Sequence, residues 1–148
     1  MREDLANELY AKYPELFTDN RVSLDVGNGW YVLLDGLFGL LCAEFRKAKK
    51  KYDEDSHIDN ANELAGEQLY EFEHLPAIKQ IKEKFGSLRF YAGTFRPEHR
   101  AYIDYAETMS SSICSNCGKM GNIQLDKGWL NCRCGECRKA DEETHFHG

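Results

Sequence analysis

Apolar side chains recur at three- and four-residue spacing through the central part of the chain. Between Trp30 and Phe45 they line one wide stripe, which predicts a helix buried along that stripe. Five basic residues follow at positions 46–51. Because cations favour water and the C-terminal end of a helix, we expect this helix to leave the core near Phe45. A shorter helix is predicted over residues 3–13, ended by Pro14.

The pattern beyond the centre predicts a helix, a strand and a helix in turn. Residues 76–86 are expected to form a helix that begins at a proline and ends at a glycine. Its apolar face would carry Ile78, Ile81 and Phe85. Residues 87–92 alternate between apolar and polar, as in a half-buried strand. A helix that begins near Pro97 is expected to lead directly into Cys114.

Between these two parts lies a strongly acidic stretch. Residues 53–73 contain eight acidic side chains and no lysine or arginine. Four of the acids recur at four-residue spacing, namely Asp59, Glu63, Glu67 and Glu71. Like charges at this spacing destabilise a helix by about 0.2–0.5 kcal/mol per pair, so local energetics do not explain the pattern. One interpretation is a solvated insertion without a binding role. The other is functional, namely an acidic surface that contacts a basic surface of a protein partner.

Five cysteines lie between residues 114 and 137, and four of them have the spacing of two zinc knuckles. These four are Cys114, Cys117, Cys134 and Cys137. Thiolates bind Zn²⁺ strongly, and two intervening residues let both sulfurs of a pair reach one ion. The residues between the pairs predict strand, turn and strand, so we expect a zinc ribbon. Four protein ligands leave no open coordination position, which indicates a structural metal.

The remaining cysteine of this segment, Cys132, competes with Cys134 for the fourth position. The two lie two residues apart, so on a strand both would point to the same face. Zinc spacing also tolerates the four residues between Cys132 and Cys137. Spacing alone leaves the choice open, although the symmetry of the two knuckles favours Cys134. Cys42, within the apolar stripe, is expected to be a buried core residue.

The composition is that of a globular protein that can build its own core. The chain has 148 residues, 42% of them hydrophobic, and a formal net charge of −6. This charge argues against strong sequence-independent affinity for nucleic acid or for an anionic membrane. The first residues lack the apolar core of a secretory signal, and clustered cysteines favour a reducing compartment, so we expect a cytoplasmic protein.

Four segments of the chain resemble a family of small zinc-ribbon proteins encoded by bacteriophages and prophages. They are VGNGWYVLLDGL (26–37), KEKFGSLRFY (82–91), AETMSSSICSNCG (106–118), and Gly128-Trp129 followed by Cys134 and Cys137. The likeness covers roughly residues 25–137. It implies that Cys134 and Cys137 form the second ligand pair and that Cys132 is spare. The chain departs from the family pattern at Ser87, where a second glycine is common, at Cys137, where histidine is often found, and in its longer acidic stretch.

Together these features predict an α+β fold in three parts. Residues 1–113 would form the body, with the acidic insertion 53–73, and residues 114–137 a zinc ribbon packed on it. Residues 138–148 would form a flexible tail. We recognise no catalytic motif around the histidines. The expected function is that of a non-catalytic phage accessory protein that binds a host macromolecule, for example to inhibit a host enzyme or a defence complex.

An alternative function is nucleic-acid binding through the basic segment 79–100. This segment carries six lysines and arginines against two acids, with aromatic residues among them. Candidate contacts are Lys82, Lys84, Arg89 and Tyr91. A strand that presents aromatic rings beside cations can stack bases and hold phosphates.

Overall fold

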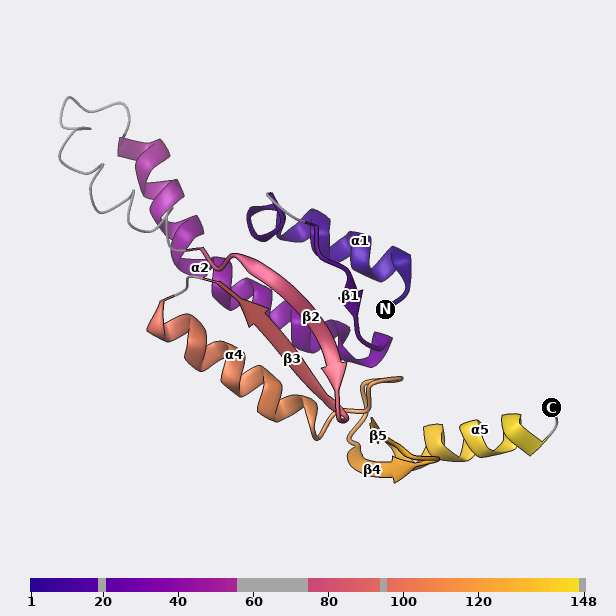
Figure 1. The fold of residues 1–148 in the computed structure, drawn as a ribbon. Helices are drawn as coiled ribbons and strands as arrows, with labels where there is room; N and C mark the ends of the chain where they lie inside the picture. Colours follow the sequence, from indigo (N-terminus) through magenta and orange to yellow (C-terminus); the bar gives the residue numbers. More distant parts are fainter. Residues whose placement is uncertain (19–20, 56–74, 94–95, 147–148) are drawn as a thin grey trace.

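Helices and strands are mixed along the chain, and the cysteine cluster lies at its C-terminal end (Figure 1). The computed structural model describes residues 1–18, 21–55, 75–93 and 96–146. The elements, including the short 3-10 helices η1 and η2, are α1 (Glu3–Lys12), η1 (Pro14–Leu16), β1 (Leu24–Asp25), η2 (Asn28–Trp30), α2 (Tyr31–Asp55), β2 (Ile78–Lys84), β3 (Ser87–Ala92), α4 (Pro97–Ser110), β4 (Asn122–Asp126), β5 (Trp129–Arg133) and α5 (Gly135–Phe146). The predicted α+β class is confirmed.

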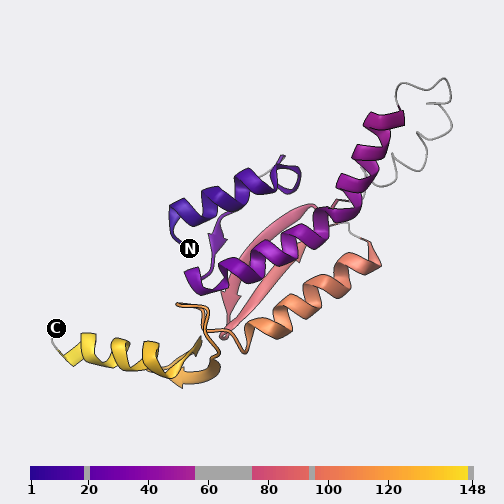
Figure 2. The ribbon, with the colours of Figure 1, turned by 180° about the vertical axis from the view of Figure 1, so that it is seen from behind.

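The body is built on a three-stranded sheet of order β1-β2-β3, parallel between β1 and β2 and antiparallel between β2 and β3. Helices α2 and α4 contact each other and lie on one face of this sheet (Figure 2). On that face, Leu24, Ile81 and Phe90 are in register across the three strands, and all three are buried. The next register row is Asp25, Lys82 and Arg89, and it faces away from the helices.

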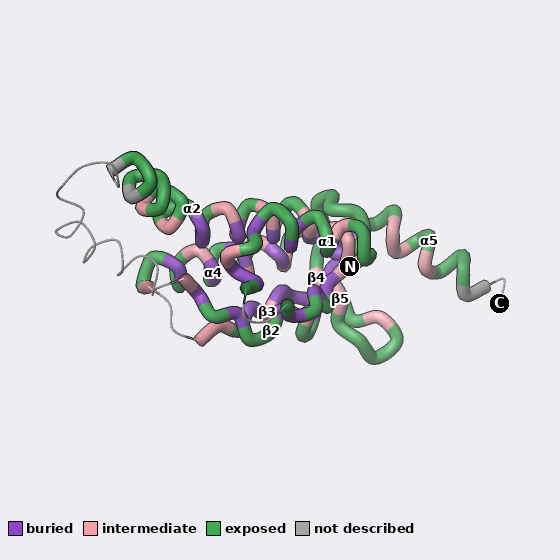
Figure 3. The backbone as a smooth tube through the Cα atoms, turned by 90° about the horizontal axis from the view of Figure 1, so that it is seen from above, coloured by how far each residue is buried: buried purple, intermediate pink, exposed green. Residues whose placement is uncertain are grey.

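The apolar stripe of α2 forms the centre of the core, as the sequence predicted. Leu34 and Phe38 of α2 are fully buried, as is Trp30 at the end of η2, and Cys42 belongs to the same core cluster. Phe45 is only half-buried and the basic residues that follow it are mostly exposed, so the helix leaves the core where expected. Buried positions concentrate between the sheet and the helices, whereas α5 is largely exposed (Figure 3).

Side chains of α4 accept hydrogen bonds from the backbone N–H groups along the outer edge of strand β3. The backbone N–H of Leu88 donates to Ser110 Oγ at 2.8 Å, and that of Phe90 donates to Glu107 Oε1 at 3.0 Å. An edge strand otherwise presents unpaired N–H groups that recruit other chains. Helix α4 therefore protects this edge as well as covering the sheet.

The prediction of a helix over residues 76–86 is wrong, because residues 78–84 form strand β2. A register shift between Ile78 and Gln80 inserts an irregularity into the strand. It lets Ile78 and Ile81, three residues apart, both face the core, which imitates helical spacing. Phe85, expected on the apolar face of that helix, lies instead in the turn to β3 and is exposed.

The C-terminal end also differs from the expectation. The segment predicted as a flexible tail from residue 138 belongs to α5 as far as Phe146. The four acids proposed as a contact surface, Asp59, Glu63, Glu67 and Glu71, lie outside the described residues. Within the described part of the chain, no helix has the length and apolar character needed to cross a bilayer.

Candidate metal centre

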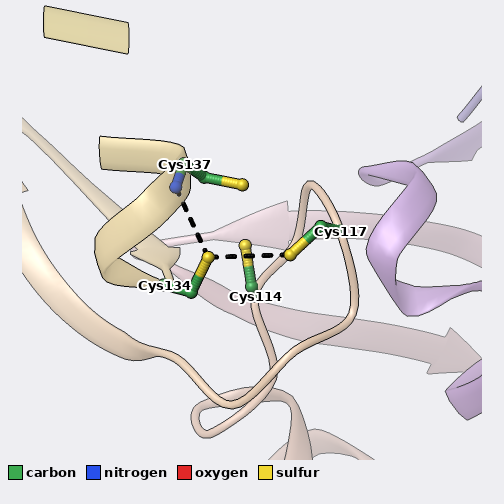
Figure 4. Close-up of side chains that lie close together, drawn as sticks. All are labelled: Cys114, Cys117, Cys134 and Cys137. Atoms are coloured by element: carbon green, nitrogen blue, oxygen red, sulfur yellow. Dashed lines mark hydrogen bonds between the residues drawn. The ribbon is translucent and has the colours of Figure 1, made fainter. Parts of the chain in front are cut away.

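Two knuckles bring four cysteines together at the end of the body. Cys114 and Cys117 lie in the turns that follow α4, Cys134 follows strand β5, and Cys137 lies in the first turn of α5. Their Sγ atoms all lie within 4.8 Å of one another (Figure 4). The Sγ atoms of Cys117 and Cys134 are 3.6 Å apart. A tetrahedral ion with metal–sulfur bonds of about 2.3 Å requires sulfurs about 3.8 Å apart, so this group can hold a metal ion.

Polar N–H groups surround the sulfurs and favour their anionic form. The backbone N–H of Cys137 donates to Cys134 Sγ at 3.4 Å, and Asn116 Nδ2 donates to Cys137 Sγ at 3.3 Å. Burial raises the pKa of Cys114, but backbone N–H donors from Cys117, Cys134 and Asn116 outweigh it and lower the pKa to about 6. Such donors orient metal-binding thiolates and stabilise their charge.

The thiol of Cys137 shows why the cluster suits a cation. The Asn116 amide lowers the pKa of Cys137, but burial and hydrogen bonds to the neighbouring thiols outweigh it and raise the pKa to about 12. Four sulfurs this close repel one another once ionised, so one thiolate makes the next harder to form. A divalent cation at the centre offsets that repulsion with its own positive charge, so the thiols can lose their protons and coordinate it as thiolates.

Cys132 lies outside the cluster and in the hydrophobic core. It is fully buried, and its Sγ lies 3.4 Å from the carbonyl oxygen of Ser111. Its strand partner is Ile123, so its side chain faces the body rather than the four sulfurs. The structure thus brings together the four predicted cysteines and leaves out the fifth.

The first knuckle packs against η2, just before α2 begins, through two glycines. The backbone N–H of Gly29 donates to the carbonyl oxygen of Ser115 at 2.9 Å. A Cβ atom at Gly29 would lie only 2.1 Å from the carbonyl oxygen of Cys114, and one at Gly27 only 1.9 Å from that of Ser115. Trp30 Nε1 adds a hydrogen bond of 2.9 Å to the Ile113 carbonyl. Only glycine permits this approach. The contact was not predicted from the sequence, although the two glycines of Gly27-Asn28-Gly29 are the signal that could have indicated it.

The predicted nucleic-acid contacts gather on the sheet face opposite the helices. Lys82 is paired in register with Arg89, and Lys82 Nζ lies 5.8 Å from the centre of the Tyr91 ring. Lys84 follows two residues after Lys82 and therefore projects to the same face of β2. Arg89 Nη1 lies 3.8 Å from a carboxylate oxygen of Glu107, which partly neutralises it.

An apolar groove between α2 and α4 is a feature that the sequence did not predict. Its volume is about 660 Å³, and its lining includes Val32, Gly36, Leu40 and Tyr105, with Cys117 near the metal centre. Val32 and Tyr105 are largely exposed. The groove combines residues from two helices distant in sequence, so no local pattern could reveal it.

Comparison of the chain with protein-family models, with curated proteins and with solved structures gives no match. The functions of the metal centre, of the basic face of the sheet and of the apolar groove are therefore inferred from their own residues and geometry.

Proposed function

We propose that this chain is a non-catalytic, zinc-binding accessory protein of a bacteriophage or prophage, which acts in the host cytoplasm by binding a host macromolecule. The observation that carries the proposal is the group of four cysteine sulfurs within 4.8 Å of one another. With Zn²⁺ in place all four positions would be filled by protein, which is typical of structural rather than catalytic sites. The metal would then hold the two knuckles together and keep the ribbon in place.

Zinc is the metal that this donor set favours. Four thiolates in tetrahedral arrangement select zinc or iron, and the two C-x2-C pairs are the spacing of zinc ribbons. The phage origin rests on the resemblance of residues 25–137 to phage-encoded proteins and not on the site.

The proposed function is tested by purifying the tagged chain from a bacterial host and analysing both its metal and its bound partners. We expect one zinc per chain and a co-purifying host protein or nucleic acid. The matched variants are Cys134→Ala, which should lose the zinc, and Cys132→Ala, which should keep it. A Cys132→Ala chain without metal, or a parent chain with no bound macromolecule, would contradict the proposal.

A host protein is the first candidate partner, with inhibition of a host enzyme or defence complex as the outcome. It is supported by the apolar groove, since exposed apolar surface commonly marks protein contacts.

The acidic stretch supplies a second contact, to a basic surface of the partner. Replacing Asp59, Glu63, Glu67 and Glu71 by Asn or Gln should slow association with the partner. The slowing should fade at high salt, because exposed charges act over only about 8–10 Å in physiological salt.

Nucleic acid is the second candidate partner, favoured by the arrangement on strands β2 and β3. Lys82, Arg89 and Tyr91 share one face of the sheet, so cations and an aromatic ring are presented together. Phosphate contacts release counterions, so the affinity for an oligonucleotide should fall steeply between about 50 and 200 mM salt. An affinity that does not change with salt would exclude this candidate.

A further inference from the structure

Two hairpin turns in this chain share the same backbone conformation. Each has a two-residue loop in which a non-glycine residue with positive φ is followed by glycine. In the β2–β3 turn these are Phe85 (φ 54°) and Gly86 (φ 83°), and in the β4–β5 turn Lys127 (φ 49°) and Gly128 (φ 85°). Two positive φ values in such a loop are the pattern of a type I′ turn, for which asparagine or aspartate followed by glycine is preferred.

Phe85 is unsuited to this backbone, and the packing of the body does not explain it. A bulky residue at positive φ is a steric outlier, whereas asparagine tolerates the same conformation. Phe85 is 66% exposed, so little burial offsets the strain. Gly86 is explained by packing, since a Cβ there would lie 3.0 Å from the Ile123 side chain. Residues with a strained backbone of this kind cluster at functional sites, such as ligand-binding sites.

The surroundings of Phe85 indicate what its ring contacts. Lys84 Nζ lies 5.5 Å from the centre of the Phe85 ring, and Lys82 Nζ lies 5.8 Å from that of Tyr91, which is also exposed. Each exposed ring of this hairpin therefore has a lysine ammonium over one of its faces. The cations complement phosphates, and the rings offer apolar faces to unpaired bases. Proteins that bind single strands combine these two features.

We propose that Phe85 is a base-stacking residue, and that the β2–β3 hairpin binds single-stranded nucleic acid. Lys82 and Lys84 hold phosphates, while Phe85 and Tyr91 stack bases. A duplex does not satisfy this surface, because its bases are already stacked on one another and cannot lie on the rings. The inference rests on the second candidate function. It adds that the ligand is single-stranded and that Phe85 stacks on one of its bases.

The test compares matched substitutions at the two turns in the full, zinc-loaded chain. Binding is measured by fluorescence anisotropy with a labelled oligothymidine, alone and annealed to its complement. Stacking contributes about 1–3 kcal/mol per base, so Phe85→Asn should weaken binding of the single strand about 5- to 150-fold. The same substitution should raise the melting temperature by about 2–4 °C, because asparagine relieves the strain. Phe85→Trp should retain the affinity.

Lys127→Asn is the control, since it places the same side chain on the same backbone at the other hairpin. It should not lower the melting temperature and should leave the affinity unchanged. A lower melting temperature for Phe85→Asn would show that the ring serves folding, and would overturn the inference. So would an unchanged affinity, or equal affinity for the duplex, although the parent chain would still bind nucleic acid. If the parent chain binds no oligonucleotide, both the inference and the second candidate function fail.

Discussion

Gly29 lies at the contact between the body and the metal-binding knuckle, where no side chain fits. A Cβ atom there would also approach the backbone nitrogen of Gly118 to 2.6 Å. We therefore expect Gly29→Ala to destabilise the protein by about 1–3 kcal/mol, the usual cost of overpacking, and to weaken zinc retention. The free energy of unfolding is measured by urea titration followed by circular dichroism, and zinc release by a chromogenic chelator.

Gly36 supplies the matched control for this substitution. It lies within α2, and a Cβ atom there would meet nothing within 4 Å. Gly36→Ala should stabilise the protein by about 0.5–1 kcal/mol, because glycine in a helix interior costs backbone entropy. Equal losses of stability in the two variants would contradict the close contact inferred at Gly29.

At the scale of elements, α1 is joined to α2 by Asp35. Lys12 Nζ donates to Asp35 Oδ1 at 2.8 Å, and the Tyr13 hydroxyl donates to the same carboxylate. These two hydrogen bonds, that of Lys12 first, hold the pKa of Asp35 below its usual range. A depressed pKa means that the stabilisation is present above about pH 4 and is lost as the pH falls through the folded-state value.

We therefore predict that Asp35→Asn destabilises the protein at neutral pH and that the difference from the parent chain shrinks below about pH 4. Urea unfolding of both chains between neutral and acid pH gives this difference directly, and any loss of metal at low pH affects both equally. A difference that stays constant over the whole range would mean that the Asp35 carboxylate does not link the two helices.

The elements also show which physical signals can be read from a sequence. The stripe of α2 and the two C-x2-C pairs were predictable, because each depends on spacing within one segment. Strand β2 was not, because an irregularity at Ile78 and Gln80 gave its apolar residues a helical spacing. The seat of the knuckle on Gly27 and Gly29 was also missed, since it joins residues far apart in the chain. The separation of Cys132 from the sulfur cluster followed from the resemblance and not from spacing.

For the whole molecule, metal removal should separate two levels of structure. Helix α5 begins at Gly135, between the cysteines of the second knuckle, so its first turn depends on the site. Structural zinc contributes about 10–16 kcal/mol of apparent binding free energy in small peptides, coupled to folding. We expect a chelator to unfold β4, β5 and α5, while α1, α2 and α4 persist around their own core.

Far-ultraviolet circular dichroism should accordingly lose only a minor part of the helical signal. Hydrogen exchange followed by mass spectrometry should place the new exchange after residue 113. Complete loss of the helical signal would mean that the body cannot hold its core without the ribbon. That result would point to Cys132 and Ile123, through which the ribbon contacts the core.

The hydrogen bond from Trp30 to the carbonyl of Ile113 has a consequence for the order in which the protein matures. The indole is fully buried, yet its acceptor lies 83 residues further along the chain. Synthesis proceeds from the N-terminus, so η2 lacks this cover until residues 113–118 have left the ribosome. A prematurely terminated chain without residues 113–118 would leave Trp30, Gly27 and Gly29 without these contacts. Chaperones and proteases act on chains that expose surface which is normally buried. Residues 113–118 thus close the part of the core that contains Trp30.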